Sequence, residues 1–353
     1  MSDYLQALSE AFGVSGDERA VRKIVLDAIK DHAEDIHIDA LGSVTALKRG
    51  TGTPAVRVML AAHMDEVGFM VTGIDSNGML RFTNVGGIDE RILPGLRVRV
   101  GANALPGAIL WTPIHKNRDQ NVVKMSNLRI DIGANSQSAA ESKVKPGDRV
   151  AFDSEFTEIT DRIVRGKAFD DRVGCALLID VLRGGPYPVD VLAAFTVQEE
   201  IGLRGALAAA QRLEPDIAIA LEGTTAHDVI DPDANPDDLT RPNPGCKLAH
   251  GPVLTIMDRS MIVPPHLVRF LRETAESNDI PYQIKTALGG GTDAGSIHTS
   301  NAGIPSAVIS MPCRYIHAPR ALLHRDDYAN TLRLIQAALN ALTPEVIAPA
   351  TTL

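Results

Sequence analysis

The chain has 353 residues, of which 44% are hydrophobic and 22% charged, and its formal net charge at pH 7 is −9. These proportions are typical of a globular protein with room for two domains. The negative charge argues against nucleic acid or an anionic membrane as a main partner. The N-terminus lacks a basic stretch followed by an apolar one, and no apolar run approaches the roughly 20 residues of a membrane helix. We therefore expect no signal peptide, no membrane span and a cytoplasmic location.

The three cysteines, Cys175, Cys246 and Cys313, lie far apart and form no CxxC pair. An odd count without close pairs favours reduced thiols in a cytoplasmic protein over a disulfide framework. No cysteine lies beside a plausible histidine base in the motifs described below, so we expect no catalytic thiol.

The pattern of apolar residues and turns in the first half of the chain changes near residue 67. Residues 5–33 predict two helices broken at Gly13-Val-Ser-Gly16, and residues 35–48 and 55–62 predict strands. Between residues 67 and 161, short apolar segments alternate with Gly-Gly, Pro-Gly and Asn-Gly turns, and only residues 139–144 have a helical pattern. This pattern of short apolar segments and turns predicts a compact β-barrel-like insert.

Alternating helices and strands return after residue 161. The sequence predicts helices at 171–182, 202–212, from Pro264, and at 326–342, with strands at 191–197, 216–221, 282–286 and 307–311. Residues 231–251, rich in Pro, Asp and Asn, predict a loop. We therefore expect one α/β domain formed by residues 1–66 and 162–353, with residues 67–161 as an inserted β-barrel domain.

Potential metal ligands cluster where predicted strands end or helices begin. They are His63 and Asp65, Asp170, Glu199 and Glu200, Glu222, and His317. Sites in open α/β sheets form at the carboxyl edge of the strands, so these side chains should converge. Histidine nitrogens with carboxylate oxygens suit Zn²⁺, Co²⁺ or Mn²⁺. A carboxylate such as Asp170 can bridge two ions, and a hydroxide held between them becomes a nucleophile near neutral pH.

Each of these motifs has a plainer structural interpretation when it is taken alone. The pair Glu199-Glu200 also fits a solvated turn, Asp170-Asp171 a helix N-cap, and Glu222 a loop acid. His63 with Asp65 fits a strand-end hydrogen bond, and His317 fits a core histidine. The glycine-rich stretch 289–295 lacks the spacing of a phosphate-binding loop, which favours backbone that lines a substrate cleft.

Taken together, the motifs resemble a known family, the M42 metallo-aminopeptidases. These are also called tetrahedral or glutamyl-aminopeptidase-like peptidases, and some members are described as endoglucanases. The resemblance rests on residues 62–71, 166–174, 197–206, 289–294 and 314–317, and it extends over almost the whole chain. It implies a mixed-sheet dimetal peptidase domain (phosphorylase/hydrolase-like) with a PDZ-like β-barrel insert used in dimerisation. It also implies self-association, typically as a homododecamer.

The resemblance assigns roles to individual residues. Asp170 would bridge two ions, with Glu200 and His317 on one ion and His63 and Glu222 on the other. Glu199 would be the general base, and Asp65 would orient the imidazole of His63. The peptide bond between Asp170 and Asp171 would be cis. We expect substrate contacts from Gly290, Gly291, Thr292 and Asp293.

Glu222 departs from the family pattern, in which this ligand is commonly Asp. Among related dimetal peptidases, Asp here tends to accompany aminopeptidases, and Glu accompanies other amidohydrolases and carboxypeptidases. The loop 231–251 also looks longer than usual, and Asp228 is an alternative carboxylate to support a ligand.

The sequence therefore predicts an enzyme, a dimetal aminopeptidase that acts on short peptides. A dimetal deacylase or carboxypeptidase is the second reading, favoured by Glu222. A glycosidase would rest on the carboxylate pairs alone and would leave His63 and His317 without a role. A scaffold with structural metals would have no use for Glu199.

Overall fold

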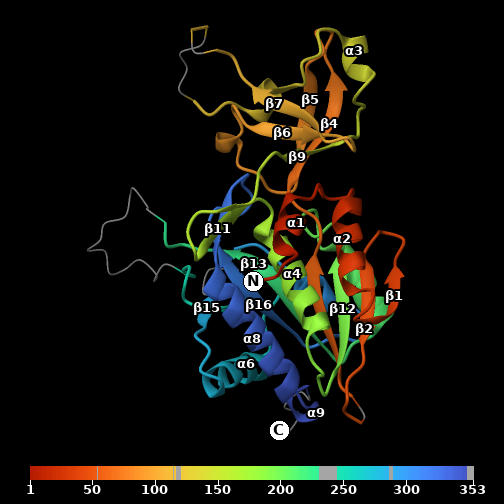
Figure 1. Ribbon diagram of the computed structural model, residues 1–353, viewed down its shortest axis with the longest axis vertical. Helices are drawn as coiled ribbons and strands as arrows, with labels where there is room; N and C mark the ends of the chain where they lie inside the picture. Colours follow the sequence, from red (N-terminus) through yellow and green to blue (C-terminus); the bar gives the residue numbers. More distant parts are fainter. Residues whose placement is uncertain (54, 114, 117–120, 230–244, 286–288, 348–353) are drawn as a thin grey trace, which may run out of the picture.

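The computed structural model describes residues 1–53, 55–113, 115–116, 121–229, 245–285 and 289–347. Figure 1 shows two bodies, a large one in which helices cover a sheet and a smaller barrel above it. The chain enters the barrel after β3 (Arg57–His63) and is back in the large body at α4 (Phe169–Arg183). The predicted fold, an α/β body with a barrel insert, is confirmed.

The large body is built on a mixed eight-stranded sheet. Its order is β1 (Glu34–Ile38), β2 (Val44–Lys48), β12 (Asp190–Thr196), β3, β13 (Ile217–Thr225), β16 (Ser306–Cys313), β14 (Val253–Thr255) and β15 (Gln283–Lys285). The four central strands β12, β3, β13 and β16 run parallel to one another. Their carboxyl ends therefore meet at one edge, the edge nearest the barrel.

Both faces of the sheet are covered, because side chains alternate along its strands. Val58 and Leu60 of β3 join the core under α4, whereas Met59 and Ala61 join the core under α5 (Arg204–Leu213). The α4 face also carries α1 (Leu5–Glu10), α2 (Arg19–Ile29), α6 (Pro265–Ser277), α8 (Arg325–Ala341) and α9 (Pro344–Ile347). The opposite face carries α5 and α7 (Ala294–Ile297). Burial on both faces explains why the central strands read as continuous apolar runs.

The inserted body is a closed antiparallel barrel. Its order is β4 (Gly68–Ile74), β5 (Leu80–Val85), β8 (Arg129–Asp131), β7 (Leu105–Leu110), β6 (Arg97–Val100) and β9 (Arg149–Phe152). Phe69 packs edge-on against Phe82 and Phe152 at 5.2 and 5.6 Å between ring centroids. The short helix α3 (Gln137–Glu141) begins where the Ser136 side chain accepts a hydrogen bond from the N–H of Ala139. The barrel therefore has its own apolar core.

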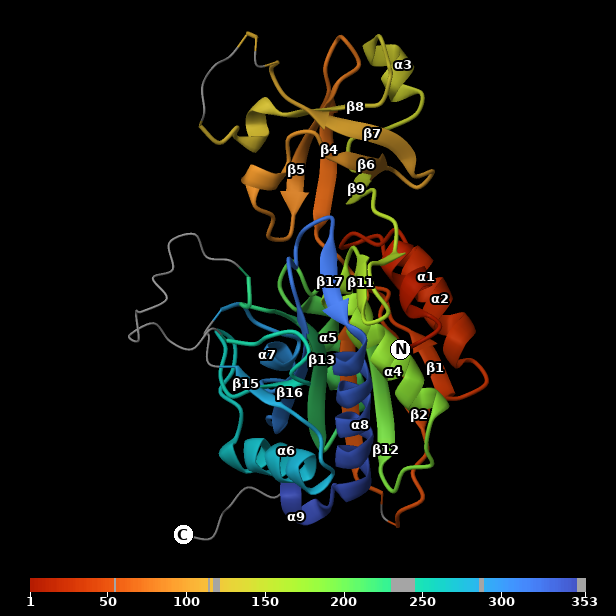
Figure 2. The same cartoon turned by 60° about the vertical axis from the view of Figure 1, so that its left-hand side comes forward.

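Several short strands are absent from the sequence prediction. β10 (Thr157–Glu158), β11 (Ile163–Gly166) and β17 (Ala321–His324) form a three-stranded antiparallel sheet, with β11 and β17 side by side below the barrel in Figure 2. Each is too short for its alternation to be recognised, and pairing with distant residues stabilises it. β14 escapes prediction for the same reason.

β13 is longer than the sequence predicts, and this changes the position of Glu222. Each residue from Ala218 to Thr225 pairs with β16, so the strand continues past Leu221. Glu222 therefore lies within the strand, whereas the sequence predicts that it follows the strand.

The predicted loop at 231–251 falls mostly outside the described residues, which resume at 245. At its flank, Asp228 forms an ion pair with Arg314 at 2.6 Å and accepts a hydrogen bond from the N–H of Leu248. Asp228 therefore contacts Leu248 and Arg314, and among the described residues it contacts none of the candidate metal ligands. Among the described residues, no helix is long and apolar enough to cross a membrane.

Candidate metal and catalytic site

The predicted ligands meet at the carboxyl edge of the central strands. His63 is the last residue of β3, Glu199 and Glu200 follow β12, and His317 follows β16. Asp170 reaches the same place from the first turn of α4. The parallel register places His63 opposite Thr196 and Glu222 opposite Ser310, so neighbouring strands deliver these groups at one level.

Asp170 lies between the two histidines. Its Oδ1 is 3.2 Å from Nε2 of His63, and its Oδ2 is 3.4 Å from Nε2 of His317. Nε2 of His63 is also 3.7 Å from Oε2 of Glu222, and Nε2 of His317 is 3.3 Å from Oε1 of Glu200. Asp170 therefore offers one oxygen to each of two neighbouring ligand groups.

The residues fit a pair of divalent ions. One group comprises His63, Asp170 and Glu222, another Asp170, Glu200 and His317, and within each the ligand atoms lie within 4.8 Å of one another. A third possible group joins His63 with Glu199 and Glu200. Nitrogen and carboxylate oxygen form the donor set expected for Zn²⁺, Co²⁺ or Mn²⁺. This donor set agrees with the dimetal site that the family resemblance implies.

Burial makes the cluster of carboxylates electrostatically demanding. Burial and nearby carboxylates raise the pKa values of Glu199 and Glu222 well above their ordinary range. Burial acts to lower the pKa of His317, but Asp170 and Glu200 outweigh it and raise that pKa to about 11. The site therefore holds an excess of acidic groups that cations would compensate.

Asp65 organises the site more widely than the sequence suggests. Nδ1 of His63 lies 3.1 Å from the backbone carbonyl oxygen of Asp65 and 3.5 Å from its Oδ1. The buried carboxylate also accepts hydrogen bonds from the N–H groups of Glu199 and Glu200, at 2.9 and 3.2 Å. Asp65 thus contacts both the imidazole and the adjacent acidic pair. The sequence gives no signal for the two backbone contacts, because they depend on how β12 ends.

The peptide bond between Asp170 and Asp171 is cis, as the resemblance implies. The side chain of Asp171 is buried and contacts backbone donors. Its carboxylate accepts hydrogen bonds from the N–H groups of His63 and Gly174, both at 3.0 Å. The hydrogen bond from Gly174 caps the first turn of α4, so Asp171 fits the helix-capping interpretation. Asp170, in contrast, contacts the two histidines.

A cavity of about 610 Å³ opens over the cluster. Three of the four predicted substrate-contact residues, Gly290, Gly291 and Thr292, line it. Asp293 does not: it is buried beneath, receives the hydroxyl hydrogen bond of Thr196, and its N–H donates to Oε1 of Glu222 at 3.3 Å. Other residues that line the cavity are not predicted from the sequence, and they include Gly87 of the barrel, His227 and Lys285. They come from segments without a recognisable motif.

The three cysteines are free and buried. Burial raises the pKa of Cys175 and Cys313 far from the range of a reactive thiol. The Sγ–H of Cys175 donates to the backbone carbonyl of His63 at 3.2 Å. These thiols have structural surroundings, in line with the expectation from the sequence.

Glu18 is buried near Asp65 and has a raised pKa, from which we expect the folding stability of the protein to depend on pH. Burial raises its pKa from 4.5 to about 7, although the N–H of Gly16 donates to it. The folded carboxyl then binds its proton more tightly than the unfolded one, so the wild-type chain loses stability as pH rises from about 4.5 to about 7. We expect Glu18→Gln to remove this loss and to be more stable than wild type at pH 8 by about 3 kcal/mol.

Urea unfolding of Glu18→Gln and wild type at pH 5 and pH 8 measures this effect. The difference between the two chains should grow toward pH 8. An equal difference at both values would contradict a raised pKa for Glu18.

Comparison with known proteins agrees with this geometry. The sequence profile of the M42 glutamyl aminopeptidase family matches residues 42–334. A putative aminopeptidase of Acetivibrio thermocellus is 38% identical over 340 residues, which cover 96% of this chain and 98% of that protein.

Two solved structures extend the comparison to the fold. The TET aminopeptidase of the marine sediment archaeon Thaumarchaeota archaeon SCGC AB-539-E09 has a TM-score of 0.90 and 38% identity, over 98% of this chain and 97% of that one. The Pyrococcus horikoshii TET1 peptidase, described as assembling into a tetrahedron or a large octahedral shell, has a TM-score of 0.84 and 34% identity, over 96% and 99%. The chain therefore belongs to the M42 glutamyl aminopeptidase family and is a peptide-bond hydrolase.

Proposed function

We propose that the protein is a dinuclear metal-dependent aminopeptidase that removes N-terminal residues from short peptides. The observation that carries this proposal is the position of Asp170, with one carboxylate oxygen toward each histidine. Glu200 and His317 would hold one ion with it, and His63 and Glu222 the other. Zn²⁺, Co²⁺ or Mn²⁺ suits these donors.

The two ions, when bound, would make a water molecule acidic and polarise the scissile carbonyl. Glu199 is the general base in this proposal. Its carboxylate lines the cavity and its Oε2 lies 3.8 Å from Nε2 of His63, beside both ligand groups. It would take a proton from the attacking water and return it to the leaving amine. Asp65 would hold His63 and the backbone of Glu199 in place.

The residues that line the cavity support the proposal that the substrate is a peptide. Its floor carries the acidic groups, which would attract the free α-amine of a peptide, and Gly290 and Gly291 leave room for the peptide backbone. Thr292 would add a polar contact at the same wall. Asp293 would help to hold Glu222 in position, because its N–H donates a hydrogen bond to Oε1 of Glu222.

We further propose that the protein self-associates through its barrel, as a homododecamer, and that residues 67–161 form the domain responsible. The related TET1 peptidase of Pyrococcus horikoshii is described as assembling into a tetrahedron or a large octahedral shell. Leu110, Trp111 and Val122 of the barrel region are 37%, 43% and 53% exposed, and large exposed apolar side chains favour an interface. The free, buried cysteines support a cytoplasmic location.

Matched peptides with free and acetylated N-termini test the reaction. We expect cleavage of the free peptide only, loss of cleavage after chelation, and recovery with Zn²⁺ or Co²⁺, because the free amine and the ions are both required. Metal-dependent cleavage of the acetylated peptide would instead establish the deacylase reading that Glu222 favours. Cleavage of a β-glucan in the presence of chelator would establish a glycosidase, and no cleavage of any substrate with two ions bound would exclude an enzyme of these classes.

A further inference from the structure

The carboxylate of Asp65 has a third hydrogen-bond donor, the hydroxyl of Ser15. Ser15 Oγ donates to Oδ2 of Asp65 at 2.6 Å, which is shorter than either backbone contact from Glu199 or Glu200. Both side chains are fully buried. A hydroxyl that donates to a buried carboxylate makes a charge-assisted bond, so Ser15 contributes strongly to the orientation of Asp65.

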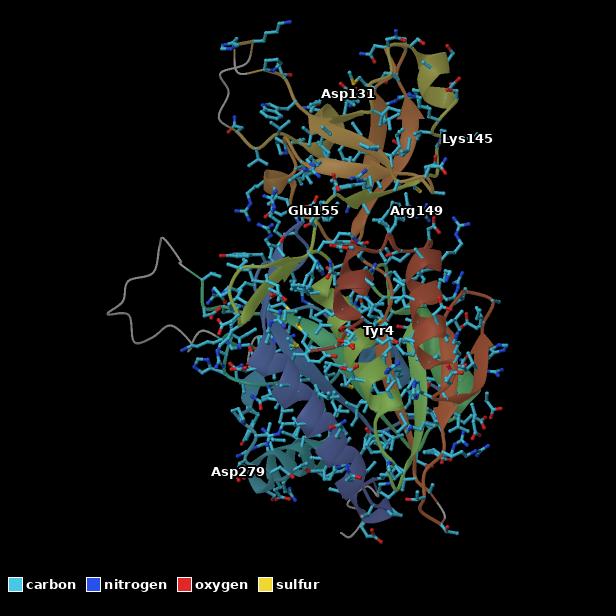
Figure 3. All side chains as sticks on the ribbon, viewed as in Figure 1. Tyr4, Asp131, Lys145, Arg149, Glu155 and Asp279 are labelled. Carbon is cyan, nitrogen blue, oxygen red and sulfur yellow. The ribbon has the colours of Figure 1, made fainter. Side chains whose placement is uncertain are left out.

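Ser15 is itself held from two sides. Its N–H donates to the backbone carbonyl of Glu66 at 3.4 Å, and the N–H of Glu66 donates to the backbone carbonyl of Gly13 at 2.9 Å. These two bonds form a parallel β-bridge between Val14 and Glu66, the residue after Asp65. From the barrel, Nε–H of Arg149 on β9 donates to the backbone carbonyl of Ser15 at 2.9 Å. Figure 3 labels Arg149 where the barrel meets the large body.

Arg149 is anchored in turn by the barrel. Its Nη1 donates to the carbonyl of Gly147 at 2.8 Å and lies 3.2 Å from Sδ of Met70. A continuous set of contacts therefore leads from β9 through Ser15 to Asp65, and from Asp65 to the imidazole of His63. The hydroxyl of Ser15 is the one link in this set that a single-atom deletion removes.

We propose that Ser15 is a positioning residue for the metal site, which acts by fixing the carboxylate of Asp65. The proposal rests on the function proposed above, in which His63 is a metal ligand. Without the hydroxyl, Asp65 would retain its two backbone donors but lose its shortest contact, and the carboxylate could turn relative to His63. Loss of a group that contacts a metal ligand directly weakens metal binding by about 10- to 100-fold, and because Ser15 acts on His63 only through Asp65 we expect the lower end of that range.

Zinc affinity tests this proposal directly. The dissociation constants for Zn²⁺ of wild type and Ser15→Ala are measured by competition with a chelator, and kcat and KM are measured at saturating zinc. We expect zinc binding to weaken by about tenfold, kcat to fall by a similar factor and KM to change less than about threefold. Ser300→Ala is the matched control, because Ser300 is also buried but donates to the backbone carbonyl of Ile297, away from the site.

A double-mutant cycle with Asp65→Asn separates positioning from general destabilisation. If Ser15 acts through Asp65, adding Ser15→Ala to Asp65→Asn should change zinc affinity by no more than about twofold. The proposal would be overturned if the effects of Ser15→Ala and Asp65→Asn on zinc affinity multiplied in the double variant. An equal loss of zinc affinity in Ser300→Ala, or unchanged zinc affinity in Ser15→Ala, would also overturn it. Failure of the proposed peptidase function would appear separately, as an inactive wild type, and the zinc affinities would still decide the role of Ser15.

Discussion

Glu199→Gln should abolish most of the peptidase activity while both ions remain bound. The substitution keeps the size of the side chain but removes a carboxylate that can accept a proton. Because general-base catalysis contributes about 10²- to 10⁴-fold, we expect kcat to fall by about a thousandfold with little change in KM. The measurement is steady-state hydrolysis of a free-amine peptide, with the metal content of each sample determined in parallel.

The metal content gives this experiment its discriminating power. One possible ligand group in the structure includes Glu199 with His63 and Glu200. If Glu199→Gln loses an ion along with activity, Glu199 is a ligand and the proposed general base is wrong. Full activity with two ions bound would also reject it. Glu273→Gln, exposed on α6, is the control and should behave as wild type.

Glu66→Gln should produce a large loss of folding stability. Oε1 of Glu66 accepts hydrogen bonds from Nζ of Lys167 at 2.6 Å and from Nη2 of Arg172 at 3.2 Å, and all three side chains are buried. Burial lowers the pKa of Lys167 to about 8, so its amine is still protonated at pH 7. Removing the anion leaves two buried cations, and we expect the free energy of unfolding to fall by about 3–5 kcal/mol.

This ion cluster also holds the N-terminal segment against the rest of the large body. Lys167 donates to the carbonyl of Ala11, and Arg172 donates to the carbonyls of Leu8, Ala11 and Gly13. Urea unfolding at pH 7, with both chains saturated with zinc, measures the loss. Asp27→Asn breaks an exposed pair with Lys23 and should leave the unfolding midpoint unchanged. A loss in Glu66→Gln below about 1 kcal/mol would contradict a buried, uncompensated charge.

The barrel contacts both the cavity and the segment that supports Asp65. Gly87 of the barrel region lines the cavity, and Arg149 of β9 contacts the segment that supports Asp65. The insert therefore contributes to the lining of the cavity and to the framework of the candidate metal site, in addition to its proposed part in self-association. Changes at the barrel base should influence catalysis even where they are distant from the substrate.

The sequence by itself determined the α/β rhythm, the position of the barrel insert and the set of candidate ligands. It could do so because apolar periodicity is local, and because His63, Asp170, Glu199, Glu200 and His317 lie at the ends of recognisable elements. Family resemblance supplied the pairing of these ligands, and the structure places them with Asp170 between the histidines.

Only the tertiary structure decided which residues support that site. Ser15 lies 50 positions before Asp65, and Glu66 lies 101 positions before Lys167, so no local pattern connects them. The length of β13, and hence the place of Glu222 inside a strand, depends on pairing with β16. The sequence predicts that Asp293 contacts the substrate, whereas in the structure Asp293 is buried and does not line the cavity. Such contacts arise from long-range packing, in which burial and hydrogen bonding between distant segments outweigh local preference.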